Sequence, residues 1–294
     1  MIPAQGSFIC VENRLATMVH PRNKRTFVFD LDGTVLNSKN QFPNEIKELI
    51  LNIVSCGELV VFATGRMHIS AKKLLDKVFE GHVDFPIISY NGAVVYVPGE
   101  GIIFKRTLAK ETVDKIVDFF RSKGIHIQSY VDDKLYSEKD NEEIRLYSKH
   151  ADVPYVVVDD LKKLPAPIKI LAIASADILD NLIPEVKELV GDGASVFKSF
   201  PIFLDMVPSD ANKGIALKFL SERLSFDLND TVVFGDNEND VFMFEVAGTC
   251  IAVENAVEKL KEVADFVTLS NDENGVLHAF SVLYPQYLCR NVEG

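Results

Sequence analysis

The sequence predicts an α/β protein: a Rossmann-like, doubly wound parallel sheet that is interrupted by an inserted α+β domain. Two observations favour this fold class. Short apolar runs alternate with amphipathic stretches over residues 26–90 and again from residue 202 onward. Between these two regions the sequence pattern changes to short apolar runs separated by residues typical of hairpin turns. Alternation of strands and helices is typical of βα units around a parallel sheet, and 294 residues suffice for about two domains.

The first part of the chain is expected to form three βα units. Ile46, Leu49, Ile50 and Ile53 recur at helical spacing, and Cys56-Gly57 ends that helix. The apolar runs on either side are short and bounded by polar or turn residues, as buried strands are. The expected strands are 26–29, 59–63 and 86–90, and the expected helices are 45–54 and 67–80.

The middle of the chain is expected to form the inserted domain. The Pro-Gly-Glu-Gly sequence at 98–101 joins two short strands within 93–107, which is a hairpin signal. Helices are expected at 109–123, 140–150 and 176–190. Strands are expected at 125–130, 134–137, 155–158, 168–174 and 195–200.

The βα pattern resumes at Ile202, so the first domain is expected to continue to the end of the chain. Its expected strands are 203–207, 231–234, 250–253 and 266–269, and its expected helices are 214–224, 240–247 and 256–263. The sequence therefore predicts a core of residues 25–91 and 201–294, an inserted cap of residues 92–200, and an N-terminal tail of residues 1–24 in which Met18 is an alternative start.

Composition and charge exclude several classes of protein. The chain is 47% hydrophobic and 25% charged, as in ordinary globular proteins. Its net charge of −12 disfavours nucleic acid and anionic membrane surfaces as partners. The four cysteines show no C-x-x-C spacing, and there is no long apolar run. We expect a cytoplasmic protein with reduced thiols, present as a monomer or a weak homo-oligomer.

Three apolar strands end in polar clusters. Asp30-Leu31-Asp32-Gly33-Thr34 follows the first strand, Thr64-Gly65-Arg66 the second, and the run from Asp236 to Asp240 follows residues 231–234. In open α/β sheets the ligand site lies beyond the carboxyl ends of the strands. Four aspartates in one crevice repel one another unless a cation neutralises them, and their oxygens suit Mg²⁺. The sequence therefore predicts a magnesium site.

These motifs, with Lys213-Gly214 opening a helix, resemble in order and spacing those of the haloacid dehalogenase superfamily of phosphotransferases. The insert, which lies between the second and third motifs, resembles the type IIB cap of Cof-type phosphatases. The resemblance covers residue 25 to about residue 283. It implies a Mg²⁺-dependent phosphatase that acts through an aspartyl-phosphate on a small phosphorylated metabolite, such as a sugar phosphate.

The resemblance also implies roles for individual residues. Asp30 is then the nucleophile, and Asp32 is the general acid and base. The implied metal ligands are Asp30, the backbone carbonyl of Asp32, Asp236 and, in or behind the metal shell, Asp240. The implied phosphate-binding or substrate-binding residues are Leu31, Thr64, Gly65, Arg66, Lys213 and Asn239.

Several alternatives remain open from the sequence. Asp240 could be only an acid at a helix N-terminus, and Arg66 could contact substrate or cap or pair with a carboxylate. His126, Gln128 and Tyr130 share one face of the expected strand 125–130, which could cover the active site or simply be half-exposed. A phosphosugar mutase shares the nucleophile, acid and metal. A non-hydrolytic phosphate-sensing module is a further alternative, against which the large insert and Asp32 argue.

Overall fold

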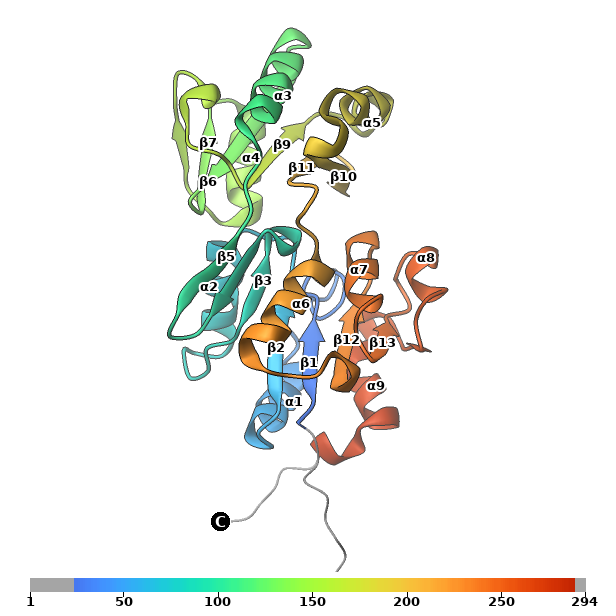
Figure 1. The fold of residues 1–294 in the computed structure, drawn as a ribbon. Helices are drawn as coiled ribbons and strands as arrows, with labels where there is room; N and C mark the ends of the chain where they lie inside the picture. The colour runs from blue at the N-terminus through green and yellow to red at the C-terminus, as the bar shows by residue number, and fades with distance from the viewer. Residues whose placement is uncertain (1–23, 289–294) are drawn as a thin grey trace, which may run out of the picture.

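In the computed structural model, which describes residues 24–288, the core is an eight-stranded sheet with the order β14-β13-β12-β1-β2-β3-β4-β5 (Figure 1). The strands from β14 to β3 run parallel, and β4 and β5 add an antiparallel hairpin at one edge. The core strands are β1 Thr26–Phe29, β2 Leu59–Ala63, β3 Ile87–Ser89, β4 Val94–Val97, β5 Gly101–Lys105, β12 Thr231–Gly235, β13 Thr249–Ala252 and β14 Phe266–Val267.

Helices cover both faces of this sheet, which confirms the doubly wound fold. The side chains of successive strand residues point to opposite faces, so Phe27 and Phe29 pack in one apolar layer and Val28 in the other. The first layer contains α1 (Asn44–Ser55), α2 (His68–Val78) and α9 (Gly275–Leu283). The second contains α6 (Lys213–Leu224), α7 (Val241–Phe244) and α8 (Glu258–Lys261). Strands buried on both faces explain the continuous apolar runs in the sequence.

The inserted domain is built on a six-stranded sheet with the order β10-β11-β9-β6-β7-β8. Helices α3 (Lys110–Ser122) and α5 (Ala176–Val190) pack on one face, and α4 (Glu142–Ala151) packs on the other. In Figure 1 this domain lies above the ends of the core strands. Its strands are β6 His126–Val131, β7 Lys134–Ser137, β8 Tyr155–Val157, β9 Lys169–Ile173, β10 Ser195–Phe200 and β11 Phe203–Val207.

The structure corrects both expected edges of the insert. The hairpin β4–β5, assigned to the cap as part of residues 92–200, pairs with β3 in the core sheet. Conversely β11, assigned to the core as the start of residues 201–294, pairs with β9 and β10 in the cap sheet. An antiparallel hairpin can extend a parallel sheet at its edge, so pairing direction alone does not mark a domain boundary.

Residues 1–23 lie outside the described part of the chain, and the expectations of an N-terminal tail and of a start at Met18 lie there with them. Lys24 and Arg25 precede β1. Among residues 24–288, no helix combines the length and the apolar character that crossing a membrane requires.

Candidate active site

The three polar clusters follow three neighbouring parallel strands. The cluster after β1 lies in the middle, between the cluster after β2 and the cluster after β12. β1 pairs with β12 along one edge and with β2 along the other. The three strands run in the same direction, so Asp30, Thr64 and Asp236 follow them at one end of the sheet. The start of α6 completes the site, because its first residue reaches Asp30.

Lys213 is a completely buried cation that joins two of the aspartates. Its Nζ donates hydrogen bonds to Asp30 Oδ1 at 2.5 Å and to Asp240 Oδ1 at 2.6 Å. Burial lowers the pKa of Lys213, but the two carboxylates outweigh it, so the pKa is raised and the side chain stays charged. The Asn212 side chain accepts from the Ile215 N–H and caps α6, which fixes the helix start that carries the lysine.

The acidic cluster has the chemistry of a divalent cation site. Carboxylate oxygens of Asp30, Asp236 and Asp240 lie within 4.8 Å of one another. Burial, with the charges of Asp240, Asp236 and Asp32, holds the pKa of Asp30 well above its ordinary value although Lys213 opposes this. Burial and the charge of Asp240 raise the pKa of Asp236 to about 7. Carboxylates that resist ionisation in this way fit a hard cation such as Mg²⁺.

Asp240 already has partners for both of its carboxylate oxygens. Oδ1 accepts from Lys213, and Oδ2 accepts from the backbone N–H groups of Asp236 at 2.9 Å and of Asn237 at 3.0 Å. With the Asn237 side chain it forms a capping box on the short 3₁₀ turn Glu238–Asp240. This geometry favours a role in which Asp240 orients Lys213 and the Asp236 loop, and direct ligation of a metal by Asp240 stays a prediction.

Thr34 belongs to the site, although it received no role from the sequence. Its hydroxyl donates to Asp236 Oδ1 at 2.8 Å, which orients that carboxylate. Gly33, with φ +84°, lies so close that a Cβ there would be 2.4 Å from Asp236 Oδ2. Gly33 and Thr34 therefore both contact Asp236, which lies 202 positions after Thr34 in the sequence. Gly33 is needed because any side chain there would collide with Asp236. The only sequence signal for Thr34 was its place in the motif.

Arg66 pairs with Asp32 in the structure, and its expected contact with substrate stays a prediction. Its Nε donates to Asp32 Oδ2 at 2.7 Å, and its second guanidinium nitrogen donates to Oδ1, so the pair is bidentate. Burial lowers the pKa of Arg66, but the hydrogen bond and charge of Asp32 raise it by more. The Asp32 side chain is 46% exposed. The expected acid is therefore accessible to solvent.

The residues that are expected to bind phosphate differ in their surroundings. Thr64 is fully buried, and its hydroxyl accepts from the Arg66 N–H at 3.1 Å. Asn239 Nδ2 donates to Asn91 Oδ1 at 2.8 Å, and Asn91 in turn packs against Gly65. Leu31 packs its side chain in the core, so only its main chain is available for a ligand.

The cap face with His126, Gln128 and Tyr130 is an internal polar network. Gln128 and Tyr130 are fully buried, and Gln128 Nε2 donates to the Tyr130 hydroxyl at 2.5 Å. The Tyr130 ring packs edge-on against Tyr147 of α4, and the His126 ring lies 3.0 Å from the Asn141 amide. The three side chains share one face, as the alternation predicted, but α4 and, at Tyr130, the core residue Tyr90 pack against it.

We expect Tyr130→Phe to lower the free energy of unfolding by about 1 to 3 kcal/mol, because the buried Gln128 amide loses its acceptor. Chemical denaturation measures this, with Tyr155→Phe, a tyrosine hydrogen-bonded to Asp140 at the surface, as the control. The order in which phosphorylated substrates are preferred should stay the same. A changed order without loss of stability would instead make this face a substrate-binding surface.

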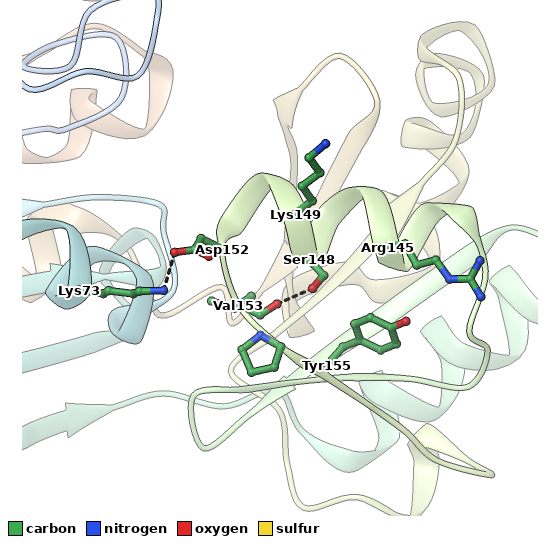
Figure 2. Close-up of a pocket in the computed structure, with 8 residues that line it drawn as sticks. Lys73, Arg145, Ser148, Lys149, Asp152, Val153 and Tyr155 are labelled. Carbon is green, nitrogen blue, oxygen red and sulfur yellow. Dashed lines mark hydrogen bonds and ion pairs between the residues drawn. The ribbon is translucent and has the colours of Figure 1, made fainter.

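A pocket of about 490 Å³ lies away from the motif loops, between the cap and the core. Figure 2 shows it lined by α4, the segment after it, and Lys73 of α2. Two of its three cations have carboxylate partners: Lys73 pairs with Asp152 at 2.5 Å, and Arg145 pairs with Asp140. The Ser70 hydroxyl donates to the Ala151 carbonyl nearby. This side of the molecule is a contact between α2 and the end of α4.

Comparison with known proteins agrees with this geometry. A family model described as haloacid dehalogenase-like hydrolase matches residues 27–280. The Bacillus subtilis protein 5-amino-6-(5-phospho-D-ribitylamino)uracil phosphatase YwtE is 31% identical, over 86% of this chain and 96% of that protein. These matches span the core and the insert together.

Solved structures agree on the fold. The structure of TM0651 from Thermotoga maritima is 44% identical with a TM-score of 0.80, and the match covers 88% of this chain and 97% of the other. The subclass IIB sugar phosphatase BT4131 is 23% identical with a TM-score of 0.76, covering 88% and 98%, and shares the fold. The chain therefore belongs to the haloacid dehalogenase-like hydrolases and is a phosphatase of the Cof type.

Proposed function

We propose that this phosphatase hydrolyses a small phosphorylated metabolite through an aspartyl-phosphate on Asp30, with Mg²⁺ as its cofactor. The observation that carries the proposal is the buried Asp30–Lys213–Asp240 cluster beside Asp236, with an exposed carboxylate, Asp32, two residues after Asp30. A nucleophile, a fixed cation and an acid facing solvent are the groups that phosphoryl transfer needs.

In the first step a carboxylate oxygen of Asp30 forms a bond to phosphorus, and the bond from phosphorus to the ester oxygen breaks. Asp32 donates a proton to the departing alkoxide, which leaves as an alcohol. For this, the bidentate contact with Arg66 must loosen, and the substrate phosphate offers Arg66 another anionic partner. The charge of Lys213 stays at Asp30 throughout.

In the second step water attacks the phosphorus of the aspartyl-phosphate and gives its proton to Asp32. Asp30 is restored as a carboxylate and orthophosphate is released. Asp30, Asp236 and the main-chain carbonyl of Asp32 would hold Mg²⁺, which when bound neutralises charge on the transferred group. Thr64, Lys213 and Asn239, with main-chain groups of Leu31 and Gly65, would bind the phosphate oxygens.

The proposed substrate is a phosphorylated sugar or sugar alcohol in the cytoplasm. The 31% identical relative is named as a phosphatase for a phosphoribitylamino compound, which supports a substrate with a phosphorylated polyol chain. A screen of phosphorylated metabolites with Mg²⁺, in which released orthophosphate is measured, tests the proposal. Conversion of a sugar phosphate to its isomer without release would point to a mutase, and a stable phosphorylated chain without turnover to a sensing module.

We expect chelation of divalent metal to stop orthophosphate release and added Mg²⁺ to restore it. Asp30 and Asp236 have raised pKa values, so they need a cation in order to be ionised together beside a phosphate. Ca²⁺ should support much less turnover, because its longer and more flexible coordination misplaces the reacting oxygens. Full turnover in a metal-free sample would contradict the proposed site.

A further inference from the structure

The turn after β3 has an unusual backbone. Tyr90, Asn91 and Gly92 follow one another with φ angles of +51°, +55° and +100°. Glycine and asparagine tolerate this left-handed region, but a bulky aromatic residue does so only under constraint. Such conformations persist where the surrounding contacts enforce them, and they are concentrated at functional sites.

Asn91 contacts two of the loops that carry phosphate-binding residues. Its backbone N–H donates to the Thr64 carbonyl at 3.1 Å, and its Oδ1 accepts from Asn239 Nδ2 at 2.8 Å. The same Oδ1 lies against Gly65, where a Cβ would be only 2.9 Å away. Asn91 is 5% exposed. One buried amide therefore joins the Thr64–Gly65 loop to Asn239.

Gly92 packs against the start of α6, where Lys213 lies. A Cβ on Gly92 would lie 2.1 Å from the Asn212 carbonyl and 2.8 Å from the Lys213 backbone nitrogen. Only glycine permits the turn to pack this closely against the start of α6. The turn at 90–92 thus contacts the loops of Thr64, Lys213 and Asn239.

The cap holds the other side of this turn. The Tyr90 hydroxyl donates to Asp133 Oδ1 at 2.8 Å, and the Tyr90 ring packs edge-on against Tyr130. Asp133 lies in the β6–β7 hairpin turn, so this contact joins the cap to the turn after β3.

We propose that the turn at residues 90–92 is a positioning element that links the cap to the phosphate site. Asn91 orients Asn239 and the Thr64–Gly65 loop for phosphate, and docking of Asp133 on Tyr90 keeps the turn in its left-handed form. This inference rests on the proposed function. Asn91 acts through its neighbours and is a positioning residue.

Asn91→Gly removes the amide and leaves a residue that adopts φ +55° without strain. We expect kcat/KM for p-nitrophenyl phosphate to fall roughly 10- to 100-fold, and the inhibition constant of orthophosphate to rise comparably, as is usual when an orienting partner is lost. Asn274→Gly, the same exchange at an asparagine with φ +56° at the start of α9, is the control and should change neither. An orthophosphate constant within twofold of the parent in a folded Asn91→Gly variant overturns the role of Asn91.

Tyr90→Phe keeps the ring and removes only the hydrogen bond to Asp133. We expect it to lower kcat/KM several-fold, and to have little further effect in combination with Asn91→Gly, because both act through one turn. Tyr96→Phe removes a Tyr–Asp hydrogen bond to Asp84, outside the cap, and is the control. Equal kinetics for Tyr90→Phe and Tyr96→Phe, or additive effects in the double variant, overturn the link to the cap.

Calorimetric titration of the full chain with orthophosphate and Mg²⁺ separates this inference from the proposed function. If no phosphomonoester is hydrolysed but orthophosphate binds and Asn91→Gly weakens that binding, the proposed hydrolysis is wrong and the positioning role holds. If orthophosphate does not bind the parent chain, both are overturned.

Discussion

Asp30→Asn will abolish orthophosphate release, by at least about 10³-fold, because an amide keeps the shape of the side chain but is a poor nucleophile. The fold should persist. Lys213 keeps its second partner, Asp240, and the change removes one of several carboxylates that repel each other in a buried site. Release from a generic aryl phosphate and from the best metabolite of the screen measures the loss, and thermal unfolding measures the fold.

Asp159→Asn, the same exchange at an exposed cap residue, is the control and should retain full turnover. The Asp30→Asn variant should still bind orthophosphate with Mg²⁺, since Thr64 and Asp236 are unchanged. Near-normal steady-state turnover would exclude the covalent intermediate. Loss of turnover with loss of the folded state would instead show that Asp30 is needed for stability, and a mass increase from phosphorylation in the parent chain alone would then test its role as nucleophile.

The core of the site could be predicted from sequence because its parts are local. Each motif follows an apolar run, and parallel strands place their carboxyl ends together, so Asp30, Thr64 and Asp236 converge by topology alone. The edges of the insert could not be predicted in this way. β11 is fully buried along its length because it lies inside the cap sheet, and such a strand has the same apolar pattern as a core strand.

Contacts between distant segments were likewise outside the reach of sequence patterns. The alternation on β6 put Gln128 and Tyr130 on one face, but that α4 would cover this face depends on the β7–α4–β8 crossover. In the sequence, Asn91 stands out only as part of an Asn-Gly pair at the point where the βα pattern ends. Its importance comes from Asn239, which is 148 positions away. Pairings at such separations follow from the packed fold and not from local periodicity.

Lys213→Met should both destabilise the protein and depress turnover of every substrate. Removing the cation leaves Asp30 and Asp240 buried without their partner, and loss of one member of a buried ion pair costs about 3 to 5 kcal/mol. Loss of a fixed positive charge at the transferred phosphoryl group should lower kcat by about 10²- to 10³-fold. Chemical denaturation and orthophosphate release measure the two effects. Lys218→Met, at an exposed position of the same helix, is the control.

The double variant Lys213→Met/Asp240→Asn separates stability from catalysis. Asp240→Asn removes the fully buried carboxylate that Lys213→Met leaves unpaired, so much of the lost stability should return. Turnover should stay low, because no cation is restored beside Asp30. If turnover recovers together with stability, Lys213 serves only to keep the acidic cluster folded, and another group must provide the charge that stabilises phosphoryl transfer.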